Sequence, residues 1–343
     1  MMDNSITTSF MNLSVKLKIR PLLFSFLTVG LFNYIFLTIY LCLRWKLITA
    51  GVFEIVSLYI AISWIPLGVW SIWYYECVLL GKFKQQSSEI ICAEDLCHCN
   101  IGIRPRSREK IAFVWAVIVL IVYFYVNKYC SDRLAFGGLK DVFYILAIMS
   151  VSVQAMLTGI GFSLSLNTIW LIKKVYCNCS IVIKPYDSDG RGGLAILKDL
   201  CFQTPVLFCS GILYLPILIE VALYLGKLYA IGILVLTFIF SAFLILSYLI
   251  PAIFIYKKIK NRIKIELAII GEKLDALYNK LNSGDNVNDL FSLITLNRYL
   301  YLDLKEISYH PINTKSVLFI FSQLLQPFMF VLIKIYLESN YKK

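Results

Sequence analysis

Charged residues are scarce in this sequence, and so are the side chains that carry out most enzyme chemistry. Asp, Glu, Lys and Arg make up only 16% of the 343 residues, and the two histidines are His98 and His310. Neither a Gly-x-Ser-x-Gly nor a His-Glu-x-x-His motif occurs. With so few candidate acids, bases and nucleophiles, the chain is not expected to be an enzyme, and no cofactor is expected.

Stretches rich in Pro or Ser, which would separate two folded domains, are also missing. What fills the chain is apolar residues, at 59% of the sequence, and the mean hydropathy is +0.75. These values exceed those of soluble globular domains. A bilayer core of about 30 Å needs a helix of about 20 apolar residues, and several such runs are present. We therefore predict an all-α, multi-pass transmembrane bundle with six spans. They cover residues 22–43, 52–80, 111–129, 142–172, 205–225 and 228–256.

A seventh apolar stretch, residues 316–333, is left open between a further span and a segment in the plane of the membrane. Its 18 residues are close to the lower limit for crossing, and they include Pro327, Gln323 and Gln326.

The distribution of Lys and Arg predicts the orientation of the spans. With six spans, the N-terminus, the loops 81–110 and 173–204 and the segment 257–315 lie on one side and carry 24 of these residues, against 6 in the opposite loops. Because basic loops stay in the cytoplasm, we expect a cell-membrane protein with a cytoplasmic N-terminus.

After the sixth span, an amphipathic helical pattern continues. Apolar residues recur every three or four positions from Tyr256 to Leu281, and a C-cap signal follows at Asn282-Ser283-Gly284-Asp285. A second helical pattern runs from Leu290 to Leu304. We expect residues 1–256 to form the transmembrane domain and 257–312 a cytoplasmic hairpin of two amphipathic helices. Residues 313–343 would be the membrane-associated or seventh spanning segment. The hairpin either packs on its own membrane domain or forms a homo-oligomer.

Two basic clusters are the candidate binding sites for anionic phospholipids, because lysines and arginines close to a membrane attract acidic headgroups. The alternative for each is a topology signal only. No aromatic-interleaved motif supports direct binding of nucleic acid. The two clusters comprise Lys257, Lys258, Lys260, Arg262 and Lys264 after the sixth span, and Arg104, Arg106, Arg108 and Lys110 before the third.

A glycine-rich loop precedes the fifth span and is a candidate site for a partner segment or an anion, or else a structural turn. Its twelfth position is Lys198, where a calcium-binding EF-hand needs Glu, and no Walker motif follows. The residues of the loop are Asp187, Asp189, Gly190, Arg191, Gly192 and Gly193.

Ten cysteines occur, five of them in two predicted cytoplasmic loops: Cys92, Cys97, Cys99, Cys177 and Cys179. A Cys-x-x-Cys pair is absent, so a zinc site is not predicted, although metal binding by these five stays open. Free thiols are expected in a reducing cytoplasm, and pairing of these cysteines in disulfides is the other alternative.

Carboxylates within the predicted spans are few. Glu54 and Glu76 lie near the ends of their span and are expected to reach the interface. Glu220 is deeper, with Lys227 as a candidate partner. Charge at membrane depth is costly and marks function by default.

Two resemblances extend these expectations. The segment Asp189-Gly190-Arg191-Gly192-Gly193-Leu194 resembles the Pro-Asp-x-x-Gly-Gly-Leu loop of uncharacterised prokaryotic multi-pass proteins, with Ser188 in place of Pro. The Ile-, Lys- and Tyr-rich composition also resembles the membrane effector that accompanies short Argonautes in archaeal antiviral systems.

The second resemblance implies a toxic effector of abortive infection. Such an effector is recruited by a nucleic-acid-sensing Argonaute-type complex, binds anionic phospholipids through basic cytoplasmic residues and depolarises the membrane. The alternatives are an ion channel or transporter, or a membrane anchor for a cytoplasmic complex.

Overall fold

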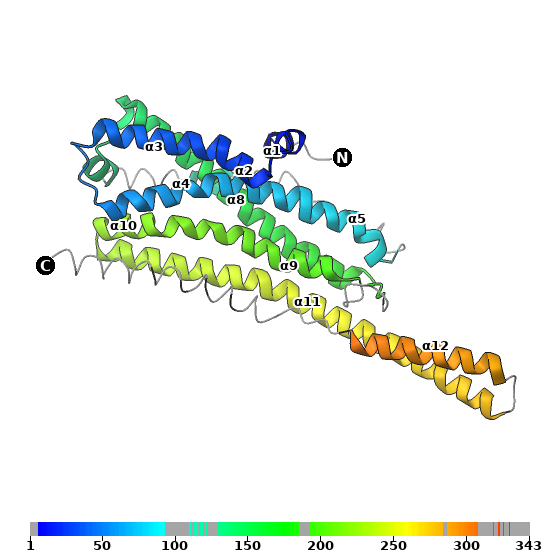
Figure 1. The fold of residues 1–343 in the computed structure, drawn as a ribbon. Coiled ribbons are helices and arrows are strands. Elements are labelled where there is room, and N and C mark those ends of the chain that lie inside the picture. Colours follow the sequence, from blue (N-terminus) through cyan, green and yellow to red (C-terminus); the bar gives the residue numbers. More distant parts are fainter. Residues whose placement is uncertain are drawn as a thin grey trace.

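The computed structural model describes residues 6–92, 129–184, 193–283 and 287–307, together with isolated helical positions between 110 and 121 and between 318 and 329. All named elements of this described part are helices, so the predicted all-α class is confirmed. Long helices lie side by side in a bundle, and one of them extends far beyond the others (Figure 1).

The α-helices differ widely in length. They are α1 (Ile6–Lys16), α2 (Pro21–Ser25), α3 (Leu31–Arg44), α4 (Val52–Trp73), α5 (Leu80–Ile90), α8 (Val142–Asn178), α9 (Ala195–Phe208), α10 (Leu215–Leu225), α11 (Lys227–Asn282) and α12 (Val287–Glu306). Short π or 3₁₀ segments join or precede some of them: η1 (Phe26–Gly30), η2 (Tyr74–Leu79), η3 (Gly138–Lys140) and η4 (Cys209–Tyr214).

The helix α4 packs against α2, α8 and α10, and the long helix Val52–Ile90 that contains it is the most buried of the four candidate spans. Pro66 lies inside α4, and its carbonyl accepts a hydrogen bond of 2.8 Å from the Ser25 hydroxyl of α2. In η2, which directly continues α4, the Tyr75 hydroxyl contacts Thr168 of α8. Such bonds satisfy polar groups inside an otherwise apolar core.

Four of the described helices are long and apolar enough to cross a membrane. They are Pro21–Arg44, Val52–Ile90, Val142–Asn178 and Leu228–Asn282, and they contain the predicted spans 22–43, 52–80, 142–172 and 228–256. The predicted span 111–129 and the stretch 316–333 fall mostly outside the described residues.

The predicted span 205–225 does not form one regular helix. It is distributed over the end of α9, the 3₁₀ segment η4 and α10. Pro205 and Pro216 flank η4, and proline lacks the N–H that a continuous α-helix needs. The α10 part is apolar but too short to count as a spanning helix by itself.

Helix α12 lies alongside the distal part of α11, away from the rest of the bundle (Figure 1). α11 ends at Asn282, at the predicted C-cap. Enclosed positions of α12 recur every four and three residues, which is the spacing of a helix–helix seam. They are Leu290, Ile294, Asn297, Tyr301 and Leu304, and Thr295 and Leu300 beside them are also partly buried. Leu293 and Leu296, also part of the predicted apolar pattern, are exposed instead.

The segments that follow α5 and α8 meet at one end of the bundle. Ile91 and Ile181 form an isolated β-bridge, and Lys184 Nζ lies 2.8 Å from Glu89 Oε2. The opposite end holds residues 45–51, the short helical segment 129–134 with the turn 135–141 after it, and Gly226. We call this the Glu54 end, after the carboxylate buried there.

Candidate functional site

The exposed face of α11 changes chemistry along its length. Leu246 and Ile253 are exposed apolar residues on the part of the helix within the bundle. Lys257, Lys260 and Lys264 then follow Ile253 at intervals of four, three and four residues, and all three are exposed. Positions at these intervals share one face of an α-helix. We call these three residues the lysine stripe.

Two other residues of the predicted basic cluster have protein partners. Lys258 Nζ donates a hydrogen bond of 2.7 Å to the carbonyl of Tyr176 and lies 5.8 Å from the centre of its ring. Arg262 Nη2 lies 2.6 Å from Glu266 Oε1, one turn further along α11. Lys260 Nζ also lies 5.6 Å from the centre of the Tyr256 ring, but this side chain stays exposed. The cluster therefore divides into an exposed stripe and two partly buried side chains held by neighbouring residues.

The second predicted basic cluster is almost entirely outside the described residues. Lys110 is helical and exposed. Arg104, Arg106 and Arg108 lie beyond what the structure describes, so their predicted role in lipid binding stays a prediction.

Most of the glycine-rich loop also lies outside the described residues, namely Asp187, Asp189, Gly190, Arg191 and Gly192. Gly193 is described, and its φ of +79° belongs to the left-handed region that glycine adopts without strain. The next residue, Leu194, is fully buried, and α9 begins after it. This last part of the loop is a structural turn into α9.

The cysteines of the two predicted cytoplasmic loops do not form a metal site among the described residues, where no group of three metal-binding side chains occurs. Cys92 and Cys177 are free. Cys179 is disulfide-bonded, which contradicts the expectation of a free thiol at this position. Cys97 and Cys99 lie outside the described residues.

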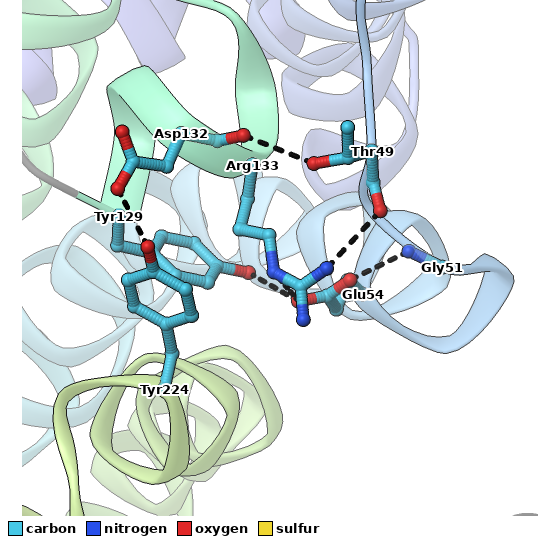
Figure 2. Close-up of polar contacts among 7 residues, drawn as sticks. All are labelled: Thr49, Gly51, Glu54, Tyr129, Asp132, Arg133 and Tyr224. Atoms are coloured by element: carbon cyan, nitrogen blue, oxygen red, sulfur yellow. Dashed lines mark hydrogen bonds and ion pairs between the residues drawn. The ribbon is translucent and has the colours of Figure 1, made fainter.

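The Glu54 end contains a polar cluster that Figure 2 draws. Its residues are Thr49, Gly51, Glu54, Tyr129, Asp132, Arg133 and Tyr224, and we call it the Glu54 cluster. Glu54 lies in the first turn of α4 and is only 8% exposed. Its Oε2 accepts a 2.5 Å bond from the Gly51 N–H, and its Oε1 accepts a 3.2 Å bond from the Tyr129 hydroxyl.

Arg133 supplies the positive charge beside this buried carboxylate. Its Nε lies 3.8 Å from Glu54 Oε1, and its Nη1 donates to the Thr49 carbonyl at 3.3 Å. The carbonyl of Arg133 in turn accepts from the Thr49 and Ala50 N–H groups, each at 3.1 Å. These contacts bind the loop before α4 to the helical segment 129–134.

Helix α10 joins the cluster through Tyr224. The Tyr224 hydroxyl donates to Asp132 Oδ2 at 2.6 Å, and its ring centre is 5.5 Å from the Arg133 guanidinium carbon. The rings of Tyr129 and Tyr224 meet edge to face at 5.3 Å. Three segments that are distant in sequence are therefore linked at one point (Figure 2).

A second ion pair lies at the same end. Arg44 Nη1 is 2.9 Å from Asp141 Oδ2, and Asp141 Oδ1 accepts from the N–H of Phe143 at the start of α8. Both arginines that the predicted outer loops contain, Arg44 and Arg133, thus have carboxylate partners.

Sequence reasoning singled out Glu54 as a carboxylate near the end of its span, and the structure shows it buried among partners in the first turn of α4. It did not identify Tyr129, Asp132, Arg133 or Tyr224 as members of a site. The available signal was a carboxylate at the start of one span and an arginine in the next loop on the same predicted side.

Comparison with protein-family models, with curated proteins and with solved structures returned no match to this chain. The site therefore has to be interpreted from its own geometry and chemistry.

Proposed function

We propose that this chain is a six-span membrane effector with a cytoplasmic N-terminus, which binds anionic phospholipids through the lysine stripe. The observation that carries the proposal is the change from Ile253 to Lys257 on one face of α11. An apolar face suits hydrocarbon, and lysines one turn further along lie at headgroup level. The predicted clusters around Lys257 and Lys110 thereby narrow to Lys257, Lys260 and Lys264, with Lys110 as an exposed addition.

Two features support the orientation. The predicted cytoplasmic loops 81–110 and 173–204 meet through the Ile91–Ile181 bridge, as expected of loops on one side of a membrane. At the Glu54 end, Arg44 and Arg133 are paired with carboxylates, which reduces the net positive charge of the side that we assign to the exterior.

The helix pair α11–α12 would then project into the cytoplasm and receive the protein that recruits the effector. Phe291, Leu296 and Tyr299 of α12 are 65%, 56% and 63% exposed. Apolar side chains on a projecting helix are typical of surfaces that bind proteins. By its resemblance to the effector of short Argonaute systems, this chain would depolarise the membrane and kill an infected cell once it is recruited.

Binding to vesicles tests the lipid part of the proposal. The triple variant Lys257→Gln, Lys260→Gln, Lys264→Gln, reconstituted in nanodiscs, should lose most of its affinity for vesicles containing phosphatidylglycerol. At about 1 kcal/mol for each lysine the loss is roughly 100-fold at low salt. The matched control is Lys273→Gln with Lys280→Gln, two exposed lysines further along α11. Equal binding by wild type and the triple variant would reduce the stripe to a topology signal.

A potential-sensitive dye tests the effector part. Cells that express the chain with its genomic neighbours should lose membrane potential only when the infection trigger is supplied. A constant potential under that trigger would contradict the proposal, whatever the vesicle result.

A second candidate is an ion channel or transporter. The observation that favours it is the presence of two buried carboxylates, since Glu54 is enclosed and Glu220, one turn before Tyr224 on α10, is 6% exposed. Buried carboxylates within spans occur on ion and proton pathways. Ion flux through reconstituted vesicles without any trigger, abolished by Glu220→Gln, would favour this function over the effector.

A further inference from the structure

The Glu54 cluster joins three segments that are distant in sequence at this end of the bundle. The loop before α4 is bound to the helical segment 129–134 through hydrogen bonds between Thr49 and Arg133. The C-terminal end of α10 is bound to the same segment through the Tyr224 hydroxyl and Asp132. The first link uses several hydrogen bonds. The second has a single hydrogen bond, ring contacts and the apolar packing of Ile217 and Val221.

The position of Tyr224 in the chain makes this second link important. α10 ends at Leu225 and α11 begins at Lys227, so Gly226 alone connects the two antiparallel helices. Gly226 has a φ of +120°, a backbone conformation that side chains disfavour. Tyr224 lies two residues before this joint. A displacement of the start of α11 therefore reaches the Tyr224–Asp132 bond directly.

Beneath the cluster lies a small apolar core. Cys130, at 6% exposure, packs there with Leu134 and with Ile217 and Val221 of α10. Its thiol is not in a disulfide. Separation of α10 from the helical segment 129–134 would open this core to water.

We infer that the Tyr224–Asp132 contact is a latch. It holds α10 and the start of α11 against the helical segment 129–134, and it opens when α11 moves. Release in response to a partner on the α11–α12 pair rests on the proposed function. The latch itself rests on the contacts at the Glu54 end. Arg133 contributes by holding both the carboxylate of Glu54 and the ring of Tyr224 in place.

The thiol of Cys130 provides a direct measurement of latch opening. The full chain in nanodiscs is treated with a charged maleimide, and modification of each cysteine is followed by peptide mass spectrometry. Cys177 is exposed and serves as the internal reference in every sample. Wild type should modify slowly at Cys130. Tyr224→Phe should raise that rate about threefold, because opening controls access and one solvent-exposed hydrogen bond to a carboxylate is lost.

The control variant is Tyr229→Phe, which removes the hydroxyl of an exposed tyrosine in the first turn of α11. It should leave the Cys130 rate unchanged. Asp132→Ala removes the acceptor from the other side of the bond, and the double variant with Tyr224→Phe should be no faster than either single variant. An unchanged Cys130 rate in both single variants would overturn the latch.

The outcome separates the latch from the proposed function. Fast Cys130 modification in Tyr224→Phe together with a constant membrane potential under the trigger would retain the latch and reject the effector. Slow modification in Tyr224→Phe together with triggered depolarisation would reject the latch and retain the effector.

Discussion

The ammonium group of Lys258 donates to the backbone carbonyl of Tyr176 at a distance of 2.7 Å. Tyr176 lies two residues before the end of α8, where helical carbonyls have no donor within their own helix. A cation at a helix C-terminus also interacts favourably with the helix dipole. Lys258 thus fastens α11 to the end of α8, in the region where α11 leaves the bundle.

Lys258 and Lys257 are adjacent in sequence, but their substitutions should affect different properties, namely stability for Lys258 and lipid binding for Lys257. Lys258→Met removes the bond to Tyr176 and should lower the free energy of unfolding by about 1–2 kcal/mol, as for hydrogen bonds from charged groups. Lys257→Met should leave stability nearly unchanged and weaken binding to anionic vesicles. Thermal unfolding in detergent and vesicle co-sedimentation provide the two measurements. Equal stability of the two variants would contradict the assigned role of Lys258.

Asp141 makes three contacts. Its Oδ1 accepts from the Phe143 N–H, and its Oδ2 accepts from the Gly137 N–H and pairs with Arg44. Asp141→Asn keeps an oxygen for the Phe143 N–H but loses the charge beside Arg44 and the acceptor for Gly137. Asp141→Ala loses all three contacts. We expect Asp141→Ala to cost about 2 kcal/mol or more, because Arg44 loses a partner whose side chain is only 5% exposed. Asp141→Asn should cost less. Chemical denaturation followed by circular dichroism in detergent would measure the order of the two.

The seam between α11 and α12 predicts position-specific costs on one helix. Ile294 is 5% exposed and Leu296 is 56% exposed, and they are two residues apart. Ile294→Ala should destabilise the helix pair by about 2–4 kcal/mol, as burial of an isoleucine side chain is lost. Leu296→Ala should be close to neutral. Hydrogen exchange of α12 amides reports the difference, and protection lost equally in both variants would place the seam elsewhere.

Two glycines of one helix system should give opposite results when replaced by alanine. Gly271 lies within α11, and a Cβ there would meet open space, so Gly271→Ala should stabilise the helix by about 0.5–1 kcal/mol. Gly226 has a positive φ, so Gly226→Ala should cost about 1–3 kcal/mol. Melting temperatures in detergent test both. A destabilising Gly271→Ala would indicate close contact with another molecule at that position.

The local patterns of the sequence predicted much of the helical framework. The apolar period after Tyr256 corresponds to the seam of α11, and the Asn282 stop is confirmed, because heptad spacing and C-cap residues act within a few turns. The predicted spans 52–80 and 142–172 do not give the ends of the helices. The helices continue beyond these apolar runs as amphipathic turns, through α5 to Ile90 and along α8 to Asn178.

What the sequence could not predict depends on contacts between distant segments. Glu54 and Arg133 are separated by the whole predicted third span, and periodicity contains no information about such a pair. The basic cluster shows the same limit at shorter range. Lys257 and Lys258 are equivalent as charges in a run, but a rotation of about 100° per residue directs one outward and the other towards α8.

The length of α11, which is helical from Lys227 to Asn282 with Pro251 inside it, has a mechanical consequence. Its 56 residues, at about 1.5 Å each, make a lever of about 84 Å. A tilt of about 5° around one end of such a lever shifts the other end by about 7 Å. A shift of that size on the α12 side thus corresponds to an angular change of only about 5° at Gly226.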